Sequence, residues 1–206
     1  MVGASKTSGN RVSGVNDLRT AFSAPRMTRA RFPSYRFLPG IDPHPTANPN
    51  GHSFRSPGTA PVLVTYVPPD QWIRSMDYLY GCDLYNHAYW WEAHEAWEGL
   101  WQLTDKRGTQ GRFLQGLIQI AACHLQLYMG HPDGVARLLS SAMRYLAPAI
   151  AQVSRGTYMG VPVADFSARV TAYFAPDSEG IPARLNHEAS EYPFIPPAVP
   201  VHFHES

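Results

Sequence analysis

The sequence predicts an all-α protein, a compact multihelical array of antiparallel helical hairpins preceded by an irregular arm rich in Pro and His. Residues 70 to 175 repeat apolar side chains every three or four positions, which is typical of helices that bury one face. Prolines and glycines crowd the segments on either side, where they exclude long helices. Short connections between the predicted helices favour antiparallel neighbours. A chain of 206 residues suffices for one domain with its own core.

Changes of composition divide the chain into four parts. Residues 1–30 are polar, lack a hydrophobic period and are expected to form a disordered leader. Residues 31–69 form the Pro/Gly/His-rich arm, expected as turns and extended chain laid over the helices. Residues 70–175 form the helical domain, and residues 176–206 return to Pro-rich coil.

Five helical segments are expected within the domain. They run over residues 70–86, 90–103 and 111–129, from Pro132 onward, and after Pro162. The first should bury one apolar stripe, made of Ile73, Met76, Tyr80 and Leu84. The third is apolar around most of its girth, so it should lie at the centre. Pro132 suits a first helical turn, whereas Pro148 should end or kink the fourth helix.

Charge and hydropathy exclude some classes of partner. The formal net charge of +1 gives no electrostatic reason to expect nucleic acid or an anionic membrane. No apolar run approaches the length of a spanning helix, and no signal-peptide core opens the chain. We therefore expect a cytoplasmic protein. The basic leader loosely resembles a transit peptide, and whether residues 1–26 belong to the mature protein stays open.

The two cysteines are too few for a disulfide framework. Cys82 and Cys123 both fall in apolar helical segments, so we expect free buried thiols, with a bridge between them left open.

The most unusual stretch is YWWEAHEAWEGLW, residues 89–101. On a helix, Trp90, Trp97 and Trp101 share one narrow sector, an aromatic ridge. His94 lies at its edge, with Glu98 one step further round and Glu95 beyond it. His94 and Glu98 are four residues apart and therefore neighbours.

The third segment offers polar side chains that need partners. Arg112, Gln115 and Gln119 are spaced three and four apart in an otherwise apolar helix, where an unpaired buried amide costs about 1–3 kcal/mol. The simplest arrangement turns them toward His94, Glu95 and Glu98. We therefore expect one polar cluster between the second and third helices, with Glu98 paired to a buried Arg112.

These residues carry a resemblance to a known family. YWWEAHEAWEGLW followed by RFLQGLIQIAACH resembles the two-part signature of the domain of unknown function 309 family, over about residues 75 to 147. The matching positions are Tyr89, Glu92, Ala93, His94, Glu95, Trp97, Glu98, Trp101, Arg112, Phe113, Gln115, Gly116, Leu117, Ile118, Gln119, Ala121, Ala122 and His124. The resemblance implies an all-helical array and supplies no catalytic assignment.

Three functions remain open, and the sequence does not decide whether the protein is an enzyme. The first is a domain that binds an unknown small molecule or protein, with Arg112, Gln115, Gln119, Trp97, Trp101 and His52 as ligand-binding candidates. The second is a metal-assisted hydrolase-like enzyme, with His94, Glu95 and Glu98 as catalytic candidates. A divalent metal is the possible cofactor, with His94, Glu98, His44 and His52 as candidate ligands and His124 as a further one. The third is a structural buried network. The oligomeric state stays unknown.

Overall fold

The computed structural model describes residues 24–60, 63–175 and 192–196. Helices are the regular elements of this described part, which confirms the all-α prediction. They are the 3-10 helix η1 (Pro69–Arg74) and the α-helices α2 (Met76–Asn86), α3 (Trp90–Gln102), α4 (Thr109–Tyr128), α5 (Pro132–Val153) and α6 (Val163–Tyr173). Most of the predicted leader, residues 1–23, and most of the predicted tail lie outside the described residues.

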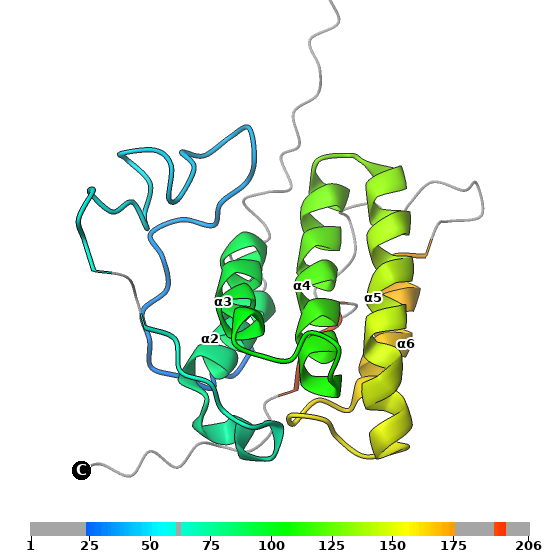
Figure 1. The fold of residues 1–206 in the computed structure, drawn as a ribbon. Coiled ribbons are helices and arrows are strands. Elements are labelled where there is room, and N and C mark those ends of the chain that lie inside the picture. Colours follow the sequence, from blue (N-terminus) through cyan, green and yellow to red (C-terminus); the bar gives the residue numbers. More distant parts are fainter. Residues whose placement is uncertain (1–23, 61–62, 176–191, 197–206) are drawn as a thin grey trace, which may run out of the picture.

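The α-helices pack in chain order, with α4 at the centre. Helix α4 contacts both α3 and α5, while α2 packs on α3 and α6 on α5. The arm lies against α2 and α3, on the side away from α5 (Figure 1). The prediction that the third helical segment is central is confirmed, because α4 carries the largest set of buried residues and is covered from both sides.

The first predicted helix is wrong in its boundaries and in its buried face. Ser75 adopts an extended conformation and caps α2, its Oγ accepting the N–H of Tyr78, so η1 and α2 are separate elements. Of the expected stripe, Ile73 and Met76 are exposed while Leu84 is buried. The face that packs against the other helices instead carries Tyr78, Leu79, Cys82 and Tyr85.

Of the two outcomes expected at Pro148, an end or a kink of the fourth helix, the end is wrong. Helix α5 continues through Pro148 to Val153. Proline lacks the N–H that would bond the carbonyl of Arg144, one turn earlier. Arg144 is exposed, so water can satisfy that carbonyl, and the helix tolerates the proline.

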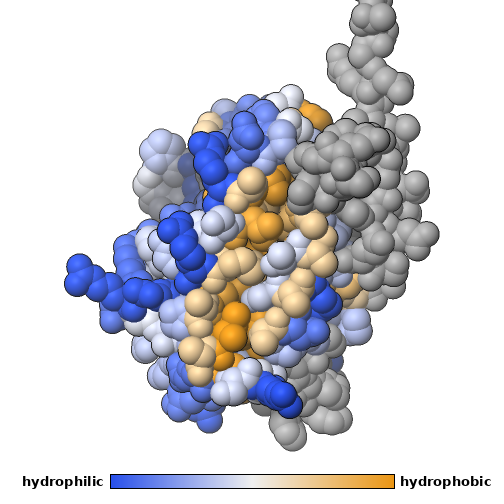
Figure 2. Space-filling model, turned by 90° about the vertical axis from the view of Figure 1, so that its right-hand side faces the viewer, coloured by the Kyte–Doolittle hydropathy of each residue, from blue (hydrophilic) through white to orange (hydrophobic). Residues whose placement is uncertain are grey.

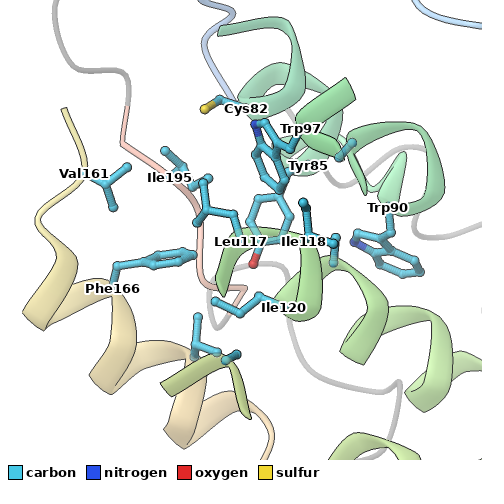
Figure 3. Close-up of a cluster of buried hydrophobic side chains, with 14 of the residues drawn as sticks. Cys82, Tyr85, Trp90, Trp97, Leu117, Ile118, Ile120, Val161, Phe166 and Ile195 are labelled. Atoms are coloured by element: carbon cyan, nitrogen blue, oxygen red, sulfur yellow. The ribbon is translucent and has the colours of Figure 1, made fainter. Parts of the chain in front are cut away.

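The core is built from large aromatic rings that need a small neighbour. Trp97 is fully buried between α2 and α4, with Tyr85 beside it (Figure 3). Its indole lies directly against Gly81 of α2, where a Cβ atom would collide with the ring. Cys82 and Cys123 are free and buried, as predicted, and burial raises the pKa of the Cys123 thiol to about 12.

Buried polar side chains of α2 and α3 hold the arm and the tail in place. The carboxylate of Asp83 accepts the backbone N–H groups of Met27 and Thr28 at 2.6 and 2.8 Å, and the Thr28 hydroxyl at 2.7 Å. Glu92 accepts the N–H of Phe37 at 2.9 Å. Residues 24–30, expected within the disordered leader, are therefore docked on the helical body.

The described tail segment, residues 192–196, is coil that packs into the core. Tyr192 and Ile195 are buried, and Ile195 lies close to the Tyr85 and Phe166 side chains (Figure 3). The Tyr192 hydroxyl donates to the carbonyl of Tyr85 at 2.7 Å and accepts the indole N–H of Trp90 at 2.9 Å. This part of the tail thus completes the core between α2, α3 and α6.

The opposite side of the molecule carries α5 and α6. A band of apolar residues runs along this face between polar flanks (Figure 2). The exposed apolar residues of the two helices are alanines, such as Ala147 and Ala168. Within the described ranges, no helix combines the length and the apolar composition that crossing a bilayer requires.

Candidate functional site

The exposed face of α3 carries a compact group of three ionisable side chains. The Nδ1 atom of His94 lies 3.4 Å from Oε1 of Glu95, and its Nε2 lies 3.8 Å from Oε2 of Glu98. One ligand atom from each of the three residues falls within 4.8 Å of the others. Their spacing along one helix produces this grouping, since residues one and four positions after His94 flank its ring. The structure therefore brings together the three residues expected as catalytic.

This group is open to solvent. The side chains of His94, Glu95 and Glu98 are 29%, 44% and 41% exposed. The alternative of a purely structural buried network does not describe these three residues. Water competes for every contact within the group, so its three side chains contribute little to stability and stay available to a ligand.

The predicted partners on the next helix do not join the group. Arg112 is exposed and forms no ion pair within the described part of the chain, so its expected pairing with Glu98 is wrong. Gly116 of α4 packs directly on Leu146 of α5. Arg112 and Gln119 lie one turn to either side of Gly116, on the side of α4 that faces α5 rather than α3.

The two α4 glutamines proposed to bind a ligand are half-buried, and no hydrogen bond links either of them to α3. Gln115 and Gln119 share this position on the flank of the helix. The Oε1 atom of Gln119 is buried without a hydrogen-bond partner among the described residues. Spacing placed the polar residues of α4 on one stripe correctly, but it could not reveal which neighbouring helix the stripe would meet.

The two tryptophans proposed to contact a ligand differ in their surroundings. Trp97 is fully buried and belongs to the core, so it is not accessible to a ligand. Trp101 is half-buried at the end of α3, where the Lys106 ammonium lies 4.1 Å from the centre of its ring. Only Trp101 of this pair borders the surface.

The arm histidines lie away from His94. His44 is exposed, and its Nδ1 accepts the backbone N–H of Ala47 at 3.3 Å. His52 binds Glu92 instead, its Nε2 lying 2.8 Å from Oε1, with both side chains 4% exposed. Glu92 and His94 point to different sides of α3, so neither arm histidine belongs to the three-residue group.

The contact between His52 and Glu92 fastens the arm to α3. Burial raises the pKa of Glu92, while the Phe37 N–H and His52 oppose that shift by stabilising the carboxylate. The ring of His52 packs against Tyr35, with centroids 4.6 Å apart. Its second nitrogen, Nδ1, lies 2.8 Å from the hydroxyl of Ser53. The predicted ligand candidate His52 is thus a buried side chain with two defined partners.

The remaining ligand candidate, His124, lies in an aromatic enclosure. Its ring stacks on Trp90 at 5.0 Å with an interplanar angle of 7°, and on Tyr192 at 5.0 Å. Its Nε2 lies 3.2 Å from the Tyr85 hydroxyl, and its Nδ1 is buried without a hydrogen-bond partner among the described residues. Burial lowers the pKa of His124 to about 3, so the ring is neutral near pH 7.

Sequence reasoning did not assign a role to the polar residues that the structure uses most. Asp83, Asn86 and Glu92 are buried and bind backbone groups of the arm and the tail. Asp83 and Asn86 stand in the apolar run YLYGCDLYN, and polar side chains in such a run require partners. The sequence therefore indicates that Asp83 and Asn86 need buried partners, but it does not indicate where in the chain those partners lie.

Comparison with known proteins identifies part of the chain. Residues 78–138 match the family described as Domain of unknown function (DUF309), which confirms the resemblance seen in the sequence. The matched residues run from within α2 to within α5 and include the His94, Glu95 and Glu98 group. Neither a curated protein nor a solved structure matches the chain. The family is that of an uncharacterised domain.

Proposed function

We propose that this chain is a binding domain whose ligand site is the exposed face of α3, where His94, Glu95 and Glu98 take a divalent transition-metal ion. The observation that carries the proposal is the grouping of one imidazole nitrogen and two carboxylate oxygens within 4.8 Å. Mixed imidazole and carboxylate ligands suit zinc and manganese, among other ions.

An ion fits among the three side chains once one carboxylate changes rotamer to reach the same side of the His94 ring as the other. Two ligand atoms about 2.1 Å from a tetrahedral ion lie about 3.4 Å apart. The contacts of 3.4 and 3.8 Å involve opposite ring nitrogens of His94, Nδ1 toward Glu95 and Nε2 toward Glu98, and one ion can bind only one of these nitrogens. Because all three side chains are partly exposed, they can change rotamer at little cost.

Three protein ligands leave at least one coordination position open. A carboxylate or imidazole from a small molecule or a protein partner would occupy that position, so the ion would join this domain to its ligand. In the alternative of metal-assisted hydrolysis, His94 and Glu98 would hold the ion, an open position would take water, and Glu95 would be the general base instead of a ligand. Binding is the simpler role, since it requires only the grouping of the three ligands.

Calorimetric titration with Zn²⁺ and Mn²⁺ tests the proposal. The wild-type protein should bind one ion per chain, and the melting temperature should rise with metal concentration. His94→Ala should weaken binding at least tenfold, and Glu98→Gln should weaken it to a smaller extent. His131→Ala is the matched control, because His131 is an exposed histidine at the start of α5. Equal affinity in the wild type and His94→Ala would contradict the site.

Cobalt spectroscopy tests the open position. Co²⁺ bound to the protein should shift its visible absorption bands when imidazole or acetate is added. Bands that do not change would mean a closed coordination sphere, which is incompatible with a ligand-bridging ion.

A further inference from the structure

The arm contains an arrangement of three side chains that the proposed metal site does not use. Glu92, His52 and Ser53 form a continuous series of contacts, with 2.8 Å from Glu92 Oε1 to His52 Nε2 and 2.8 Å from His52 Nδ1 to Ser53 Oγ. Each ring nitrogen therefore faces one oxygen. The acid and the histidine are buried, whereas Ser53 is exposed.

The buried carboxylate determines which nitrogen of His52 carries a proton. A carboxylate has no proton to donate, so as a carboxylate Glu92 accepts on Oε1 both the N–H of Phe37 and the proton of His52 Nε2. The neutral ring of His52 then carries its proton on Nε2 and keeps the lone pair of Nδ1. That lone pair faces the Ser53 hydroxyl, which donates to it. This is the arrangement in which a histidine can remove a proton from a serine.

The surrounding loop fixes this arrangement. The N–H of Ser53 donates to the carbonyl of Pro45 at 3.0 Å, and the N–H of His52 donates to the Tyr35 hydroxyl at 3.2 Å. Gly51 packs so closely on the His44 and Pro45 carbonyls that a Cβ atom would collide with them. The backbone on both sides of His52 is thus held before any substrate arrives, as a nucleophile and base pair requires.

We propose that Ser53 is a nucleophile for acyl transfer from carboxylic esters, with His52 as its general base and Glu92 as a positioning residue. In the first step, Ser53 Oγ bonds to the acyl carbon and its proton moves to His52 Nδ1. The ester C–O bond breaks, and the leaving alcohol takes that proton. Water then attacks the acyl-serine with His52 as base, giving the carboxylic acid and free Ser53. Glu92 Oε1, 2.8 Å from His52 Nε2, holds the ring in this orientation throughout.

Covalent labelling of the full chain tests the nucleophile. A fluorophosphonate probe should label Ser53, as located by peptide mass spectrometry. Ser53→Ala should abolish this labelling and Ser56→Ala should leave it unchanged, because Ser56 is an exposed serine of the same arm. His52→Gln should slow it at least tenfold. A rate of fluorophosphonate labelling at Ser53 equal to the rate at Ser56 would overturn the proposal.

Substituting His52 or Glu92 also removes the contact that fastens the arm to α3. Their roles therefore need a measurement that undocking of the arm would not change in the same way. In Ser53→Cys, the thiol pKa, measured from the pH dependence of iodoacetamide alkylation, should fall at least one unit below about 8.5. Adding His52→Gln should restore the ordinary value. Adding Glu92→Gln to Ser53→Cys should raise the thiol pKa part of the way back, because the carboxylate that holds the His52 ring against residue 53 is lost. An ordinary thiol pKa in Ser53→Cys would overturn the assignment, whichever result the metal titration gives.

Discussion

The side chain of Asn86 bonds both polar backbone groups of Ile195. Its Nδ2 donates to the Ile195 carbonyl at 2.8 Å, and its Oδ1 accepts the Ile195 N–H at 2.9 Å. One amide side chain thus pairs with the backbone of an extended segment as a neighbouring strand would. Because these groups are buried, their pairing with Asn86 avoids the cost of unpaired polar groups and favours the docked tail.

Replacing Asn86 with Ala should release the tail. The substitution leaves the N–H and carbonyl of Ile195 without partners, and each such buried group costs about 1–3 kcal/mol. We expect the free energy of unfolding, measured with urea, to fall by about 2 kcal/mol or more, together with faster proteolysis near residue 195. Asn50→Ala, at an exposed position of the arm, should change neither quantity. Unchanged proteolysis in Asn86→Ala would mean that apolar packing alone holds the tail.

Asp83→Asn should loosen the first described residues of the arm. The carboxylate accepts three hydrogen bonds from Met27 and Thr28, and an amide keeps only one acceptor oxygen in their place. Hydrogen bonds to charged groups contribute about 1.5–3 kcal/mol each, so we expect a loss of several kcal/mol. Hydrogen exchange of the Met27 and Thr28 amides should accelerate, whereas the exposed Asp70→Asn control should leave it as in the wild type.

Gly81→Ala should destabilise the core although alanine favours helices. The added methyl group meets the indole of Trp97, which is fully buried and has no space to move. Overpacking of this kind costs about 1–3 kcal/mol, more than the gain of up to about 1 kcal/mol in helix propensity. Gly99→Ala in α3 is the matched control, since its methyl group meets only Val64 of the arm, at 3.3 Å. Thermal melting should separate the two variants, and a Gly81→Ala protein as stable as the wild type would show that the indole can shift.

His124 should make stability depend on pH in mildly acidic solution. Its pKa is about 3 in the folded protein and 6.5 as an ordinary value, so the unfolded chain binds the proton first as the pH falls. Each pH unit below 6.5 therefore removes up to about 1.4 kcal/mol from the free energy of unfolding, until about pH 3. Urea unfolding between pH 4 and 7 should show a smaller slope for His124→Phe than for the wild type. The exposed control His131→Phe should keep the wild-type slope.

The sequence predicted the helices well where one face of each meets the core. Pro132 begins α5 as expected, and α3 and α4 lie within two residues of their predicted boundaries. The two errors in helix boundaries, at Ser75 and at Pro148, each have a structural cause. Ser75 separates η1 from α2 through a capping bond, and α5 continues through Pro148, one turn after the exposed Arg144.

The candidate site was only partly predictable, because some of its contacts join residues of one helix and others join residues far apart in the sequence. His94, Glu95 and Glu98 come together through helix geometry alone, which the sequence contains. The partners of Glu92 lie 40 and 55 residues away in the arm, and no periodic pattern encodes such pairs. Arg112 was expected to pair with Glu98 across the two helices, but its side chain is exposed.

Asp83 and Asn86 lie three residues apart on α2, yet they hold segments from opposite directions along the chain. Their bonds span 55 and 56 residues to the arm and 109 residues to the tail. Closing loops of that length costs entropy before any bond forms, so these contacts should appear late in refolding. Helices α3, α4 and α5, joined by short turns, should assemble first. Helix α2 should reach its final packing only when the arm and the tail dock on it. The slowest refolding phase should therefore report the docking of Met27 and Ile195 rather than helix formation.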